Sequence, residues 1–111
     1  MEDVFDHVTI RASDVEASLR FYELAFAQLG RDASHRGDGF DEWNDFSISA
    51  AESGKPVTRG LHVALVADSR AAVDEWWRVM TGAGHQDDGG PGPRPQYSPG
   101  YYGAFVRDPD G

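Results

Sequence analysis

Two copies of one short strand–helix pattern constrain this chain more than any other feature. The offset that places His62 on His7 also aligns several other pairs. They are Val8 with Val63, Ile10 with Leu65, Ala12 with Ala67, and Phe21-Tyr22 with Trp76-Trp77. A repeated supersecondary unit buries its apolar face by stacking against its neighbour. At 111 residues the chain predicts one domain. We expect residues 3–51 to form a first module and 60–111 a second.

The first copy begins with an alternating, β-branched run over residues 4–10, which predicts a strand. Ser13 followed by Glu16 is typical of a capping box, so a helix is expected to start there. Apolar residues then recur at helical spacing up to Leu29, and Gly30 predicts the helix end. Residues 31–51 predict two or three short strands with turns at Gly37-Gly39 and residues 43–45.

The second copy repeats this order. Residues 61–67 predict a strand, and Asp68 or Ser69 is expected to cap a helix that ends at residues 82–84. Residues 87–100 are rich in Gly and Pro and predict a loop, either a surface connector, which we favour, or a lid over the site. Residues 101–107 predict a strand, followed by a turn over residues 108–111.

Strand alternation predicts where the two matched histidines lie. Alternate residues of a strand face opposite sides of a sheet. If Val8 and Ile10 pack on the first helix, His7 faces the other side, and the same parity places His62 there in the second copy. The two histidines are therefore expected to converge in one cleft. They are open to two interpretations, metal ligands or hydrogen-bonded pocket histidines.

Composition excludes several classes of function. The net charge of −9 argues against nucleic acid and anionic membrane surfaces, and would favour a cationic ligand. The chain has no cysteine, which excludes disulfides and thiolate metal sites. The first seven residues do not read as a signal peptide, and no apolar run is long enough to span a bilayer. We expect a cytoplasmic location.

Three segments resemble the vicinal-oxygen-chelate superfamily, which includes glyoxalases, bleomycin resistance proteins and extradiol dioxygenases. They are residues 7–10 with 20–23, residues 60–64, and residues 104–111. The resemblance implies an α+β fold, in which two paired βαβββ modules form a cup-shaped mixed sheet with the helices outside. It also implies a homodimer. Because the module ends in a further strand, we expect that strand either to follow Gly111 or to come from a partner chain.

The resemblance implies one divalent metal ion (zinc, nickel, iron or manganese) held by His7 and His62, or no metal at all. Metal-binding members usually carry a carboxylate on the last strand of each module, where this chain has Ser47 and Ser49. The second carboxylate would follow Gly111. Gln96 and Ser98 stand where similar sequences often carry histidines.

Aromatic and polar side chains near the expected cleft are candidates for a substrate pocket. They are Trp43, Ser47, Ser49, Gln96, Tyr97 and Tyr101. Trp76 and Trp77 are expected in the core or an interface, and His35 and His85 at the surface. The acidic residues within 38–45 are expected on a solvated strand edge.

These residues are compatible with three functions. The sequence does not specify the substrate or ligand of any of them. The first is a metal-dependent lyase, isomerase or dioxygenase. The second is a metal-free binding protein of the bleomycin-resistance kind, which holds a cationic or aromatic small molecule. The third is a non-catalytic dimeric scaffold.

Overall fold

The computed structural model describes residues 4–37 and 40–111. Its elements, in chain order, are β1 (Val8–Ala12), α1 (Val15–Ala27), β2 (Phe40–Trp43), β3 (Phe46–Ala50), α2 (Arg70–Gly82), β4 (Gln86–Pro93) and β5 (Tyr102–Arg107). Asp38, which belongs to the predicted acidic edge, and Gly39, which belongs to the predicted turn, lie outside the described residues. The first residue of the predicted first module, residue 3, also lies outside them. No helix of the described part is long and apolar enough to cross a membrane.

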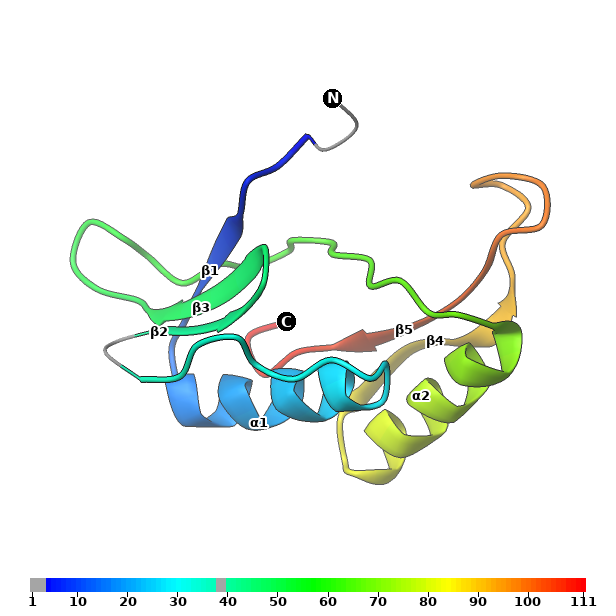
Figure 1. The fold of residues 1–111 in the computed structure, drawn as a ribbon, viewed down its shortest axis with the longest axis horizontal. Coiled ribbons are helices and arrows are strands. Elements are labelled where there is room, and N and C mark those ends of the chain that lie inside the picture. The colour runs from blue at the N-terminus through cyan, green and yellow to red at the C-terminus, as the bar shows by residue number, and fades with distance from the viewer. Residues whose placement is uncertain (1–3, 38–39) are drawn as a thin grey trace.

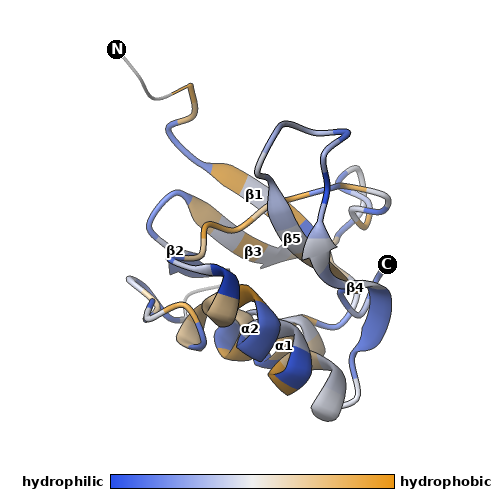
Figure 2. Ribbon diagram, turned by 90° about the vertical axis from the view of Figure 1, so that its right-hand side faces the viewer, coloured by the Kyte–Doolittle hydropathy of each residue, from blue (hydrophilic) through white to orange (hydrophobic). Residues whose placement is uncertain are grey.

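The strands form two separate sheets. The first has the order β1-β3-β2, with β1 parallel and β2 antiparallel to β3. The second is the antiparallel pair β4-β5. Both helices lie on the same side of the strands (Figures 1 and 2). The α+β class is confirmed, whereas a single cup-shaped sheet stays a prediction.

The core fills the space between the strands and the helices. Under the first sheet, Ile48 is fully buried and the rings of Phe26 and Trp43 stack 5.0 Å apart. Between the two helices, Phe21 and Met80 are buried. A buried aromatic pair stabilises a core beyond its area, by about 0.5–1.5 kcal/mol. The first sheet therefore has a closed apolar floor.

The two tryptophans of α2 fix that helix in place. Trp76 donates its ring N–H to the carbonyl of Ala25 in α1, 3.0 Å away. Trp77 donates to Asp87 at the start of β4, also at 3.0 Å. The core placement is confirmed for Trp76, which packs against Phe21 and Met80, whereas Trp77 is half-buried and bonds to Asp87 at the surface.

The predicted strand at residues 61–67 is wrong in this structure. This segment joins no sheet, and within the described residues its backbone makes no hydrogen bond. Leu61 and Val63, which strand parity would place on the face toward the helix, opposite His62, are 51% and 41% exposed. Leu65 alone of the three packs against the core. The physical reason is that no strand lies beside the segment to pair with it.

Three further predictions need correction. The first half of the expected connector 87–100 is instead part of strand β4, which tolerates Pro91 and Pro93 because it is an edge strand with two register irregularities. The first helix is capped by Asp14, which accepts the Ala17 N–H at 3.1 Å, rather than by Ser13. Strand β1 also starts four residues later than expected, at Val8.

The turn after β5 is fastened to the first helix. The Tyr22 hydroxyl donates to Asp108 at 2.6 Å. The backbone N–H and hydroxyl of Ser13 both donate to Asp110. These bonds join residues from opposite ends of the chain, so they hold the two halves together. Burial and, second, the bond to Asp108 raise the pKa of Tyr22 far above its ordinary value.

The Tyr22 contact predicts a loss of stability at alkaline pH. An unfolded tyrosine ionises at about pH 10, whereas Tyr22 in the folded protein keeps its proton at that pH. Unfolding is therefore increasingly favoured as the pH rises above about 10. We expect Tyr22→Phe to lower the free energy of unfolding by about 1–2 kcal/mol at pH 7. The variant should also lose less stability than the wild type between pH 7 and pH 11.

Denaturant unfolding at the two pH values measures both effects. Tyr97→Phe is the control, because Tyr97 is 54% exposed and is expected to tolerate the change. If Tyr22→Phe and the wild type lose equal stability at pH 11, Tyr22 does not carry this dependence.

Candidate functional site

The structure does not bring the two matched histidines together. His7 lies one residue before β1, is exposed, and pairs with Asp6 through Nδ1 at 2.9 Å. His62 lies in the 61–67 segment, and its ring meets Phe105 edge-on at 5.5 Å. Among the described residues, no hydrogen bond or ring contact joins them. His62 lines both of the cavities described below, and His7 lines neither.

The two candidate serines lie on the face of the first sheet away from the helices. Ser47 is paired with Thr9 in the β1–β3 register, and their hydroxyls are 2.7 Å apart. Ser49 is paired with Arg11 on the same face. Ser47 is buried, so its hydroxyl serves the contact between strands rather than a described cavity.

A small cavity of about 290 Å³ lies on the corresponding face of the second sheet. We call it the outer cavity, and its lining residues are His62, Asp88, Arg94, Tyr97 and Phe105. Alternation along β5 explains its position. Val106 packs against the core and Tyr102 bonds to Asp74 of α2, so Phe105 faces away from the helices.

The outer cavity combines aromatic surface with hydrogen-bond donors. The guanidinium of Arg94 lies over the Phe105 ring, 5.3 Å from its centre. Arg94 also donates to the carbonyls of Gly90 and Pro93, which fixes its position and leaves N–H groups free for a ligand. Tyr97 lies edge-on to Phe105 at 6.4 Å.

Charge pairing leaves the outer cavity with positive character. Asp88 forms an ion pair with Arg107 at 3.2 Å. Behind the cavity, Asp87 accepts hydrogen bonds from Gly89 and Trp77, and these lower its pKa. The same two hydrogen bonds hold the irregular part of β4 in which Asp88 lies. Arg94 is therefore the charged group that a ligand would meet first.

A larger cavity, of about 660 Å³, has a different character. We call it the inner slot. One wall is residues 60–67, the other is β5, and its floor includes Phe21, Ala25 and Trp76. Phe21 and Ala25 are buried core residues beneath the sheets. The inner slot thus opens onto the hydrophobic core, and it shares His62, Asp88 and Phe105 with the outer cavity.

The remaining candidates divide between core, cavity and surface. Trp43 is 3% exposed and stacks on Phe26, so its assignment to the pocket is wrong. Tyr101 lines the inner slot and meets Tyr97 edge-on at 5.2 Å. Gln96 is exposed in the loop and lines neither cavity.

Sequence reasoning missed several residues. Phe105 could have been found, because the strand around it was predicted and its parity is opposite to that of Val106. Arg94 was missed because β4 was interpreted as a connector. His85 was expected at the surface, but its ring packs on Phe21 at 4.7 Å, and burial lowers its pKa.

The described residues do not fit a metal centre. They contain no group of three or more His, Asp or Glu side chains placed to hold one ion. Catalytic zinc sites usually have three protein ligands. Beside His62 lie the Phe105 ring and, in the same cavity, Asp88, which is paired with Arg107. We therefore derive no reaction step through a metal.

Two solved structures share this fold over nearly the whole chain. A glyoxalase/bleomycin resistance protein from Albidiferax ferrireducens T118 is 26% identical, with a TM-score of 0.77, and the match covers 98% of this chain and 94% of that one. A glyoxalase-related enzyme from Fulvimarina pelagi is 24% identical, with a TM-score of 0.73, and the match covers 100% and 84%. No curated protein matches the chain.

A family model described as Glyoxalase/Bleomycin resistance protein/Dioxygenase superfamily matches residues 4–111. This match covers almost the whole sequence, and the fold agrees with it. The chain belongs to the glyoxalase/bleomycin resistance protein/dioxygenase superfamily.

Proposed function

We propose that this protein binds a small aromatic molecule that carries negatively charged or adjacent oxygen atoms, and that the outer cavity is its site. The observation that carries the proposal is the placement of Arg94 over Phe105, beside His62 and Tyr97. Phe105 and Tyr97 supply ring surface for stacking. Arg94, His62 and Tyr97 supply donors that suit oxygen acceptors.

The local charge decides which ligand is favoured. The chain as a whole carries a net charge of −9, which attracts cations at long range. Exposed charges are largely screened beyond about 8 Å at physiological salt. Inside the outer cavity the nearest unpaired charge is Arg94, because Asp88 is held by Arg107. We therefore favour an anionic aromatic ligand over the cationic one that net charge alone suggests.

Salicylate and benzamidine test the sign of that charge, because both are small aromatic molecules of opposite charge. We expect salicylate to shift the amide NMR signals around Phe105 and Tyr97, and benzamidine to leave them unchanged. Arg94→Gln should weaken salicylate binding about tenfold or more, because a hydrogen bond to a charged group contributes roughly 1.5–3 kcal/mol.

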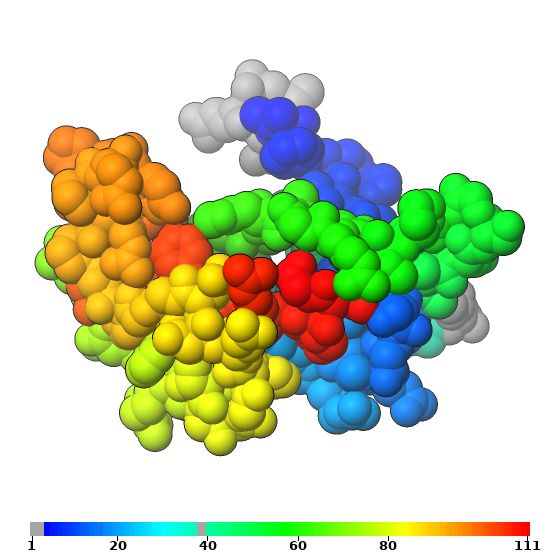
Figure 3. Space-filling model, turned by 180° about the vertical axis from the view of Figure 1, so that it is seen from behind, coloured from blue at the N-terminus to red at the C-terminus, as the bar shows by residue number. Residues whose placement is uncertain are grey.

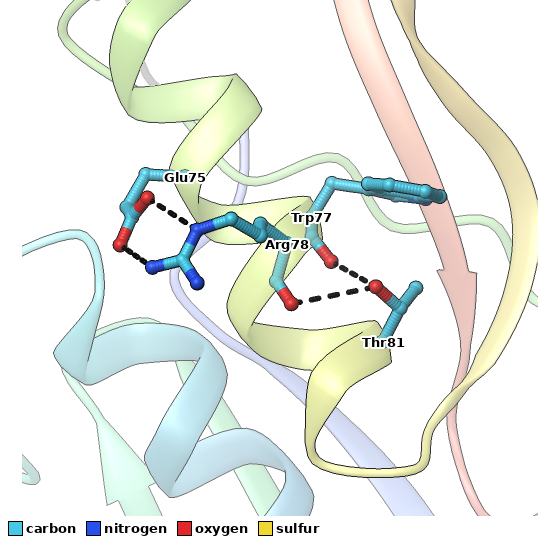
Figure 4. A network of polar contacts seen from close by, with 4 residues as sticks. All are labelled: Glu75, Trp77, Arg78 and Thr81. Carbon is cyan, nitrogen blue, oxygen red and sulfur yellow. Dashed lines mark hydrogen bonds and ion pairs between the residues drawn. The ribbon is translucent and has the colours of Figure 1, made fainter.

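Arg78→Gln is the matched control. Arg78 pairs with Glu75 on the surface of α2, whereas the neighbouring Trp77 ring points toward the strands (Figure 4). Its loss should leave salicylate binding intact. Tighter binding of benzamidine, or equal binding by Arg94→Gln, would contradict the proposal.

The alternative of a metal-dependent lyase, isomerase or dioxygenase predicts a different pattern from the same two histidines. A metal held jointly by His7 and His62 requires both, whereas the outer cavity contains only His62. We expect His62→Ala to weaken salicylate binding severalfold and His7→Ala to leave it unchanged. We also expect neither variant to change the stoichiometry of zinc or nickel binding in calorimetric titration.

Loss of one equivalent of metal in both variants would favour the metal-dependent enzyme instead. The homodimer implied by the family resemblance also stays a prediction, to be tested by sedimentation.

A further inference from the structure

Residues 89–93 of strand β4 have the sequence Gly-Gly-Pro-Gly-Pro. Both residue types are depleted in strands, because glycine has no side chain to pack and proline has no N–H to donate. Among the described residues β4 pairs with β5 alone, so its other edge accepts the prolines. Figure 3 shows β4 and the loop after it, yellow to orange, along one side of the molecule. The edge position explains the prolines but not the glycines.

Two of these glycines lie against the guanidinium of Arg94. The Arg94 side chain folds back along β4, where its Nη2 donates to the carbonyl of Gly90 at 2.8 Å and its Nη1 to that of Pro93 at 3.3 Å. A Cβ added at Gly92 would lie 3.2 Å from Nη1, and one added at Gly89 would lie 3.3 Å from Nη2. Both distances are shorter than an ordinary van der Waals contact. The lack of side chains at these two positions therefore lets the guanidinium lie on the strand.

Gly89 and Gly92 differ in what else depends on them. Gly89 has a φ of +147°, which residues with side chains rarely adopt, and a Cβ there would also lie 3.3 Å from the Phe105 ring. Gly92 has no positive φ, and the Arg94 guanidinium is its one close neighbour within 4 Å. Because that neighbour is the end of a flexible side chain, a Cβ at residue 92 would displace the guanidinium rather than the backbone.

We propose that Gly92 is a positioning residue of the outer cavity, because its lack of a side chain sets the place of the Arg94 guanidinium. The inference rests on the proposed function, since it concerns how the cavity recognises an anionic group. Two of the five guanidinium N–H groups are used by carbonyls of β4, and the others remain for a ligand. A binding group whose position is set in advance loses less freedom when the ligand arrives. A side chain at residue 92 removes that advantage.

Gly92→Ala tests the proposal, and Gly90→Ala is the matched control. Gly90 lies two residues away in the same strand, and a Cβ there would meet only the Trp77 ring, at an ordinary distance of 4.0 Å. Neither glycine has a positive φ, so alanine at either position should not lower stability. Denaturant unfolding checks that both variants keep the fold.

The first measurement needs no ligand. Nuclear Overhauser effects between the Arg94 side chain and the Phe105 ring report the place of the guanidinium, which lies 5.3 Å from the ring centre. We expect these effects in the unmodified chain and in Gly90→Ala, and their loss or reduction in Gly92→Ala.

The second measurement is the affinity for salicylate. We expect Gly92→Ala to weaken binding about threefold or more, and Gly90→Ala to leave it unchanged. In a chain that already carries Arg94→Gln, Gly92→Ala should have no further effect, because residue 92 acts through Arg94. A glycine needed only for folding would not show this dependence on Arg94.

Unchanged contact between Arg94 and Phe105 in Gly92→Ala would overturn the proposal. So would an equal effect of Gly90→Ala, or a loss of affinity from Gly92→Ala that persists without Arg94. If salicylate does not bind the unmodified chain, the proposed function fails, and the ligand-free spectra still decide whether Gly92 positions Arg94.

Discussion

The packing of the Asp108–Gly111 turn against the first helix holds this structure together. Tyr22 donates to Asp108 and Ser13 donates to Asp110, so residues near both ends of the chain meet at one point. The Tyr22 hydroxyl is partly buried, and leaving a buried polar group unsatisfied costs about 1–3 kcal/mol. The contact fixes where β5 ends, and through β5 it fixes the position of Phe105 and the outer cavity.

The two faces of the strands have different roles. The face toward the helices is apolar and carries the core, including Ile48 and Phe21. The opposite face carries polar and charged side chains, including the Thr9–Ser47 pair and Arg94. The larger cavity lies between β5 and the 61–67 segment, whereas the smaller one combines the Arg94 guanidinium with the rings of Phe105 and Tyr97.

Local patterns in the sequence predicted most of the elements. The amphipathic spacing in both helices, the Ser69 cap and the strand at β5 were all confirmed, because they depend on residues close in the chain. The 61–67 segment was not, because a strand exists only when a neighbour supplies hydrogen bonds. Strand β4 was missed because its Gly and Pro residues are typical of loops, yet an irregular edge strand accepts them.

The site was predicted less well than the fold. Strand parity placed Ser47 on the correct face, but it could not show that Trp43 belongs to the buried face of β2. Pairing His7 with His62 assumed two equivalent strands. His7 precedes its strand, and His62 lies in an unpaired segment beside Phe105, so the equivalence fails at the level of hydrogen bonding. The position of Arg94 depends on strand β4, so it could not be predicted from a sequence pattern that did not indicate this strand.

Strand β1 pairs with β3, whereas the equivalent segment 61–67 has no strand neighbour among the described residues. Residue-resolved amide hydrogen exchange of the 111-residue chain tests this most directly. The structure predicts slow exchange at Ile10 and Ala12, which belong to the ladder with β3, and exchange close to the unprotected rate at Val63 and Leu65. Equal protection of the two segments would show that residues 61–67 are paired, and would contradict this account.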